Sequence, residues 1–363
     1  MARFSYGGQA LIEGVLMRGR TAIAVALRHP DGRIVWADEK LAVGFRATRW
    51  ARLPFVRGLV VLYETLVVGT RWLVRSAGIA AVEELAPLQP APSALSAPSA
   101  LSGPNPAADL AGVQDAVDDG AIPPPAPAAP VANSADLGKG AVALMLGLTL
   151  VVGVGLFFFL PLLLAKAIAG GQSGVVERAV EGVIQIAIFL GYLLLIGRTS
   201  DVRRTFQYHG AEHMTIHALE AGDPLTVDAV RKYPTAHPRC GTEFLVVVIL
   251  VSIVVFSVVG RQAIPVMVAS RIVLIPVIAG ISYELLRFGA RHRDSRIVRW
   301  IFEPGIWVQK ITTKQPTDDM LEVAIVSLEQ ALLADDEALP DGAGRIGRSP
   351  LIISAKASPA AEA

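Results

Sequence analysis

The stretch that organises this chain runs from Arg203 to Glu243 and reads RRTFQYHGAEHMTIHALEAGDPLTVDAVRKYPTAHPRCGTE. It holds four of the six histidines of the 363-residue sequence, and its only cysteine. Together with two carboxylates, these are residue types that bind metal ions: His209, His213, His217, His237, Cys240, Glu212 and Glu220. The crowding indicates a metal site and leaves the substrate open.

Periodicity places several of these side chains on one helix. Residues 207–220 contain no proline and one glycine, which favours a helix. One stripe of that helix carries four ligand-type residues: His209, His213, His217 and Glu220. Side chains four residues apart are neighbours, whereas eight residues span about 12 Å of helix axis. The helix therefore offers one ion the pair His209 and His213 or the pair His213 and His217, and not all three.

The residues that follow are expected to return to this helix. Ala221-Gly-Asp-Pro224 ends it, and Thr226 is placed to cap a short second helix through Lys232. This hairpin can bring His237 and Cys240 back to the first helix, where either would complete a metal shell.

The segment His209-Gly-Ala-Glu212-His213 matches the pattern H-x-x-E-H of inverted zinc proteases, in which two histidines bind zinc and the glutamate polarises water. A match of five residues occurs often by chance, so it gains weight only from the ligand-type residues around it. A second reading stays open. Histidines beside a membrane also cap helix ends, bind headgroup phosphates or form hydrogen-bond networks.

Composition indicates an α-helical integral membrane protein. Hydrophobic residues make up 53% of the sequence and charged residues 18%, against about 25% charged in typical soluble domains. Four apolar segments predict transmembrane helices, near residues 141–165, 178–197, 244–260 and 264–286. The net charge of +1 gives no overall field that would favour nucleic acid, and one cysteine excludes an internal disulfide.

The distribution of basic residues predicts the orientation. Lysine and arginine gather in the loop 198–243 and after the fourth segment, while the connection 167–176 has none. The positive-inside rule then places the histidine-rich loop and both termini in the cytoplasm. Arg271 lies inside the fourth segment, where it either marks a functional site or snorkels to the interface, the reading that we favour. Glu284, at the other end of that segment, could reach a site at the membrane surface.

The remaining segments predict smaller units. Residues 1–50 are typical of a small β-rich cytoplasmic unit, with a hairpin turn at His29-Pro-Asp-Gly32 and a glycine-rich lead-in from which Glu13 could face the site. Four further units are expected: an amphipathic interfacial helix over 51–75, a disordered Ala/Pro-rich linker over 76–138, amphipathic helices over 300–333 and a disordered tail over 334–363. We favour a helix over 51–75 that lies on or dips into the membrane surface, with a spanning helix as the alternative.

Four motifs, in this order, resemble the YqhQ family of bacterial membrane proteins: Gly7-Gly-Gln-Ala-Leu-Ile-Glu-Gly14, Tyr208-His-Gly-Ala-Glu-His213, His237-Pro-Arg-Cys-Gly-Thr242 and Ala279-Gly-Ile-Ser-Tyr-Glu284. The resemblance implies a predicted metal-dependent enzyme with these motif positions: His209, Glu212, His213, His237, Cys240 and Glu13. Met214 stands where the family pattern tends to have lysine, so a catalytic or phosphate-binding role of that lysine does not carry over.

Two classes of function follow. In the first, the protein is a hydrolase in the bacterial inner membrane that acts on an unknown substrate at the cytoplasmic surface. His209 and His213 bind the ion with His237 or Cys240, and Glu212 is the general base. One of four further residues supplies a third metal ligand, or a hydrogen bond that orients a ligand: His217, Glu220, Glu284 or Glu13. Zinc suits this set best, and iron and manganese also fit.

In the second class, the protein is a membrane scaffold or assembly factor without enzymatic activity. Its histidine–cysteine cluster would then be structural. The sequence leaves the oligomeric state open under both classes.

Overall fold

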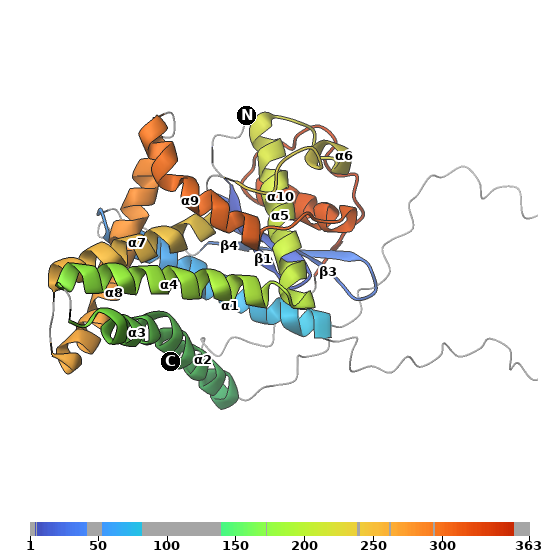
Figure 1. The fold of residues 1–363 in the computed structure, drawn as a ribbon. Helices are drawn as coiled ribbons and strands as arrows, with labels where there is room; N and C mark the ends of the chain where they lie inside the picture. Colours follow the sequence, from blue (N-terminus) through green and yellow to red (C-terminus); the bar gives the residue numbers. More distant parts are fainter. Residues whose placement is uncertain are drawn as a thin grey trace, which may run out of the picture.

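The computed structural model describes residue 4 and residues 6–41, 53–81, 139–171, 173–237, 240–260, 263–292 and 295–351. These residues form a small sheet, the helices that cover it and a group of long apolar helices (Figure 1). The linker expected over 76–138 begins later than predicted, since residues 76–81 are helical. From residue 82 onward it lies outside the described residues.

The β-rich unit expected at the N-terminus is a sheet whose strands lie in sequence order. Its strands are β1 (Gly7–Leu11), β2 (Gly14–Arg18), β3 (Ala22–Arg28), β4 (Ile34–Lys40) and β5 (Ser349–Pro350). The first four pair antiparallel, and β5 pairs parallel with β4. The turn predicted at residues 29–32 joins β3 to β4, where Gly32 has φ +87°, a conformation that glycine adopts without strain.

Helices cover both faces of this sheet. They are α1 (Val56–Ala81), α5 (Ser200–Ala221) and α10 (Asp318–Ala334). Successive residues of a strand point to opposite faces: Val15 and Met17 pack with α5 and α10, whereas Leu16 packs with Trp72 of α1. The sheet is thus the middle of three layers, and the histidine-bearing helix lies directly against it.

The disordered tail predicted from residue 334 is wrong for residues 334–351. Asp335 is buried, and its carboxylate accepts hydrogen bonds from the backbone N–H groups of Arg20 (2.6 Å) and Thr21 (2.8 Å) and from the Tyr6 hydroxyl (3.1 Å). Further along, β5 extends the sheet. This segment is held by polar contacts with distant residues and not by an apolar face. Its local sequence therefore shows no apolar periodicity from which the order could be predicted. Residues 352–363 lie outside the described part.

Replacing Asp335 by asparagine is expected to cost about 1.5–3 kcal/mol of unfolding free energy at neutral pH, the contribution of hydrogen bonds to a charged group. Burial raises the pKa of Asp335, but the hydrogen bonds from Thr21, Arg20 and Tyr6 outweigh it and hold this pKa below the ordinary value of 3.8. A lowered pKa stabilises the fold above pH 3.8, and that stabilisation is lost as pH falls through the folded-state pKa. Thermal unfolding in detergent as a function of pH measures both effects. The neighbouring Asp336→Asn should behave like the wild type, and equal losses in the two variants would contradict the assignment.

Four helices of the described residues are long and apolar enough to cross a membrane. They run over Gly147–Ala169, Gly174–Ile196, Gly241–Val259 and Ala269–Arg291, close to the four predicted segments. The elements concerned are α2 (Lys139–Val154), the π-helical η3 (Gly155–Phe159), α3 (Leu160–Ala169), α4 (Gly174–Ile196), α7 (Gly241–Val259) and α8 (Ile264–Arg291). In Figure 1 the sheet, α5 and α10 lie to one side of α7, α8 and α3. The helices suggest a membrane protein, and their insertion remains a prediction.

Arg271 does not snorkel to an interface as predicted. It is 5% exposed, and its guanidinium forms an ion pair with Glu181 of α4 and stacks 4.3 Å from the centroid of the Phe256 ring. Arg178 binds the same carboxylate at 2.5 Å. Hydropathy examines one segment at a time, so it could not show that another helix supplies the opposite charge.

The interfacial helix expected over 51–75 corresponds to α1, which is not one of the four candidate spans. Two of its charged residues pair with other parts of the protein: Arg57 pairs with Glu284 of α8, and Glu64 pairs with Arg18 of β2. The opposite stripe is apolar and exposed: Leu62, Tyr63, Leu66, Val67 and Val74. A helix with such a stripe suits a membrane surface, and that location stays a prediction for α1.

Candidate metal centre

The helix α5 carries the predicted histidine stripe. It starts at Ser200, earlier than predicted, and ends as predicted at Gly222, which has φ +79°. Gly210 lets another segment pass close to this helix, because a Cβ there would lie 2.2 Å from the carbonyl oxygen of Lys314. That segment follows α9 (Arg296–Thr312), so the end of α9 comes within reach of His209.

The chain between α5 and α7 returns to α5 as predicted. At the start of α6 (Val227–Val230), the hydroxyl of Thr226 accepts a hydrogen bond from the Ala229 N–H at 3.4 Å. Cys240 then occupies the N-cap position of α7, where its sulfur accepts from the Thr242 N–H at 3.4 Å. The thiol therefore lies where the loop between α6 and α7 meets a candidate span.

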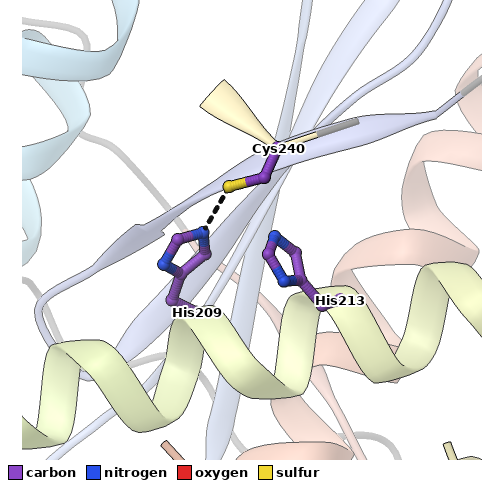
Figure 2. Close-up of side chains that lie close together, drawn as sticks. All are labelled: His209, His213 and Cys240. Atoms are coloured by element: carbon purple, nitrogen blue, oxygen red, sulfur yellow. Dashed lines mark hydrogen bonds between the residues drawn. The ribbon is translucent and has the colours of Figure 1, made fainter. Parts of the chain in front are cut away.

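His209, His213 and Cys240 converge, and we call them the cysteine group. One ligand atom of each lies within 4.8 Å of the others. Nε2 of His209 is 3.2 Å from Sγ of Cys240. Figure 2 shows both imidazoles standing on α5 with the sulfur opposite them. Two nitrogens and one sulfur form a donor set that suits zinc.

Hydrogen bonds prepare both imidazoles as ligands. Nδ1 of His209 donates to the Thr312 carbonyl at 3.0 Å, and Nδ1 of His213 donates to the Thr235 carbonyl at 2.6 Å. A carbonyl only accepts, so each Nδ1 carries a proton. Metal-binding histidines are held in this way by the ring nitrogen that does not bind the metal. Burial, together with nearby histidines, lowers the pKa of His213 to about 2, so its Nε2 keeps a lone pair at neutral pH.

Burial also sets the protonation of the two acidic groups. It raises the pKa of the Cys240 thiol to about 12, with a further contribution from the charge of Glu212. Burial raises the pKa of Glu212 to about 7, although the charge of His209 and a hydrogen bond from the Gly8 backbone lower it. Oε2 of Glu212 has no hydrogen-bond partner among the described residues. A carboxylate with a pKa near neutrality and an available oxygen is well suited to exchange protons.

Gly8 of β1 brings the sheet against this carboxylate. A Cβ on Gly8 would lie 2.4 Å from the carbonyl oxygen of Leu16 and 3.1 Å from Cδ and Oε1 of Glu212. Gly8 belongs to the glycine-rich lead-in, and the absence of a side chain there allows this close approach.

Gly8→Ala is expected to destabilise the fold by about 1–3 kcal/mol or more, because the new methyl group meets a backbone atom that cannot move aside. Gly7→Ala is the matched control, since nothing lies within 4 Å of a Cβ at Gly7. Thermal unfolding in detergent compares the two. If Gly7→Ala and Gly8→Ala lower the transition temperature equally, the close approach at Gly8 is not the cause.

A cavity of about 490 Å³ lies between β1, α1 and α5. Its wall includes all three residues of the cysteine group together with Glu212 and His237. A second cavity of about 380 Å³ also touches His209 and Cys240, and it extends along apolar residues of α4 and α7: Phe189, Leu193 and Leu245. A ligand in the first cavity would thus contact the candidate metal ligands, and the two cavities share His209 and Cys240 in their walls.

His237 belongs to a second set of ligand-type residues, the glutamate group. Ligand atoms of His217, Glu220 and His237 lie within 4.8 Å of one another. The His237 ring also adjoins the cysteine group: its centroid lies 4.4 Å from that of His217 and 5.7 Å from that of His213. From the sequence, His237 was a candidate ligand of the same ion as His209 and His213. In the structure His237 groups with His217 and Glu220 instead, because the returning loop runs along α5 and meets successive turns of it.

Two candidate residues lie in ion pairs apart from both groups. Both oxygens of Glu13 bind Arg204 at 2.6 Å, and one also accepts from the Tyr208 hydroxyl. Glu284 binds Arg57 and the backbone N–H of Phe55. Neither residue belongs to the cysteine group or the glutamate group.

Sequence reasoning missed the backbone groups that orient the ligands. The backbone carbonyls of Thr235 and Thr312 fix the orientation of two imidazoles. Every residue has a backbone carbonyl, so the pattern of side chains cannot predict which carbonyls take this role. It also missed Gln309 of α9, which is fully buried and whose Oε1 accepts from the His237 backbone N–H at 2.9 Å. A polar residue on an otherwise apolar helix face was the one available signal for Gln309.

Comparison with known proteins supplies a family. The profile of the family described as "Protein of unknown function (DUF1385)" matches residues 53–334. The chain belongs to the DUF1385 family. It is 29% identical over 336 residues to YqhQ of Bacillus subtilis (strain 168), described as an uncharacterized protein, and the match covers 90% of this chain and 92% of that one. No solved structure matches.

The DUF1385 match confirms the resemblance drawn from the motifs. It spans α5, the returning loop and α10, and therefore both ligand groups. The family description names no metal and no reaction, so these remain to be argued from the chain itself.

Proposed function

We propose that this protein is a metal-dependent hydrolase of the bacterial inner membrane, with a multi-pass topology, both termini in the cytoplasm and its site at the cytoplasmic face. One observation carries the proposal. Two imidazoles and a thiol converge on the wall of a cavity, and a buried carboxylate with an unpartnered oxygen lies on the same wall. The orientation rests on the basic loops of the sequence.

The donor set fits a divalent ion. His209 and His213 already have Nδ1 bound to carbonyls, and Cys240 would lose its proton when it binds an ion. Zinc matches two imidazoles and a thiolate best, and three protein ligands leave a position open, as in catalytic sites. The ion, when bound, supplies Lewis-acid activation of the scissile group and of water.

Glu212 has the properties of the general base. Its pKa of about 7 lets it accept a proton at neutral pH and return it. In hydrolysis it would take a proton from the attacking water and deliver that proton to the leaving group. The apolar second cavity beside α4 and α7 supports a substrate that reaches the site from the membrane surface.

His213→Ala is expected to reduce the metal content of detergent-purified protein. Loss of a residue that only hydrogen-bonds a metal ligand lowers metal affinity about 10–100-fold, and loss of the ligand itself should lower it at least as much. Elemental analysis measures the metal content directly. His292→Ala is the control, because His292 is an exposed histidine at the end of α8. An equal, substoichiometric content in wild type and His213→Ala would reject the site.

A further inference from the structure

The glutamate group lies beyond the cavity that serves the proposed hydrolase. His237 reaches the cavity wall, whereas His217 and Glu220 are not part of its lining. His217 and His237 contribute nitrogen, and Glu220 contributes an exposed carboxylate. Two histidines and one glutamate are a known set of zinc ligands.

His217 is oriented in the same way as the histidines of the cysteine group. Its Nε2 donates to the Ala236 carbonyl at 2.9 Å, so in the neutral ring the lone pair is on Nδ1. The ring also stacks on Tyr233, with an interplanar angle of 8° and centroids 5.9 Å apart. A hydrogen bond and a flat ring contact together fix the direction of this imidazole.

The other two members are held by different elements. The His237 backbone N–H donates to buried Gln309 of α9 at 2.9 Å, and its Nε2 lies 3.3 Å from Oε2 of Glu220. Glu220 is in the last turn of α5. The three donors therefore come from the helix and from the loop that returns to it.

We infer that the glutamate group is a second divalent-cation site, which binds an ion independently of the cysteine group. An ion there would tie the end of α5 to the segment 235–237, which leads on to Cys240. Its role is structural, because two of its three ligands, His217 and Glu220, lie outside the lining of the cavity. The inference does not depend on hydrolysis.

The test is a cobalt(II) titration of the metal-stripped full-length protein in detergent. An ion in the cysteine group gives a thiolate-to-cobalt charge-transfer band, and an ion in the glutamate group does not, because it has no sulfur. The wild type should bind two equivalents, one with the band and one without. Glu220→Gln should weaken the equivalent without the band by at least about 10–100-fold and leave the band unchanged.

Each other outcome separates the two sites. One equivalent that gives the band in the wild type would overturn the second site and leave the first, and the contact between His237 and Glu220 would then be only a hydrogen bond. Two equivalents that persist in both Glu220→Gln and His217→Ala would place the second ion elsewhere and also overturn the inference. Binding without the band would overturn the cysteine group, and no binding would overturn both. Glu303→Gln, a carboxylate of α9, is the matched control and should bind like the wild type.

Discussion

Glu212→Gln is expected to yield a folded, metal-loaded protein whose hydrolytic rate is about 10²–10⁴-fold lower, the contribution of a positioned general base. Glutamine has the shape of glutamate, so the packing against Gly8 is kept. It cannot accept a proton from water near neutral pH. The loss should therefore appear in the rate, whereas the metal content should stay that of the wild type.

The rate is measured with a panel of chromogenic substrates in detergent micelles. The panel contains 4-nitrophenyl carboxylic esters, 4-nitrophenyl phosphate monoesters and 4-nitrophenyl phosphate diesters. Elemental analysis and thermal unfolding are measured on the same samples. Glu337→Gln is the control, since Glu337 lies outside both ligand groups and pairs loosely with Arg20 at 3.9 Å. A wild-type rate in Glu212→Gln, combined with strong destabilisation in His213→Ala, would instead support a structural cluster in a membrane scaffold.

Glu181→Gln is expected to destabilise the protein by about 3–5 kcal/mol, the cost of removing one partner from a buried ion pair. Glu181 neutralises both Arg178 and Arg271, and all three side chains are 5–6% exposed. Without that carboxylate, two guanidinium groups remain buried with one fewer negative charge beside them. Because glutamine preserves the volume, the loss reports on charge rather than on a cavity.

The matched control for Glu181→Gln is an exposed pair. Glu39 and Arg71 form an ion pair with side chains 41% and 40% exposed, and such pairs contribute only about 0–1 kcal/mol. Thermal unfolding in detergent should show a large fall in transition temperature for Glu181→Gln and a small one for Glu39→Gln. Similar shifts in the two variants would show that the buried ion pairs are not needed for stability.

The sequence was sufficient for features that depend on local pattern. The 3.6-residue period placed the histidine stripe on α5. Turn and cap residues predicted the β3–β4 hairpin, the end of α5 at Gly222 and the cap at Thr226. Hydropathy located the four candidate spans. Each of these signals is contained within about twenty consecutive residues.

Features that depend on distant partners could not be predicted in the same way. Arg271 is buried because Glu181, from another helix, lies opposite it. The division of the ligands into two groups depends on how the returning loop lies along α5, and residue types alone do not fix that path. The order of residues 334–351 likewise depends on contacts of Asp335 with the N-terminal strands.

The position of Cys240 limits how this protein can be dissected. Cys240 lies at the N-cap of α7, an apolar helix and candidate span, while its two histidine neighbours lie on α5, which is not a candidate span. A fragment built from the sheet, α5 and α10 alone would lack Cys240 and would leave an incomplete centre. Experiments on this centre therefore require a polypeptide that contains both the sheet with α5 and α10 and the apolar helices that include α7, from the first purification step onward.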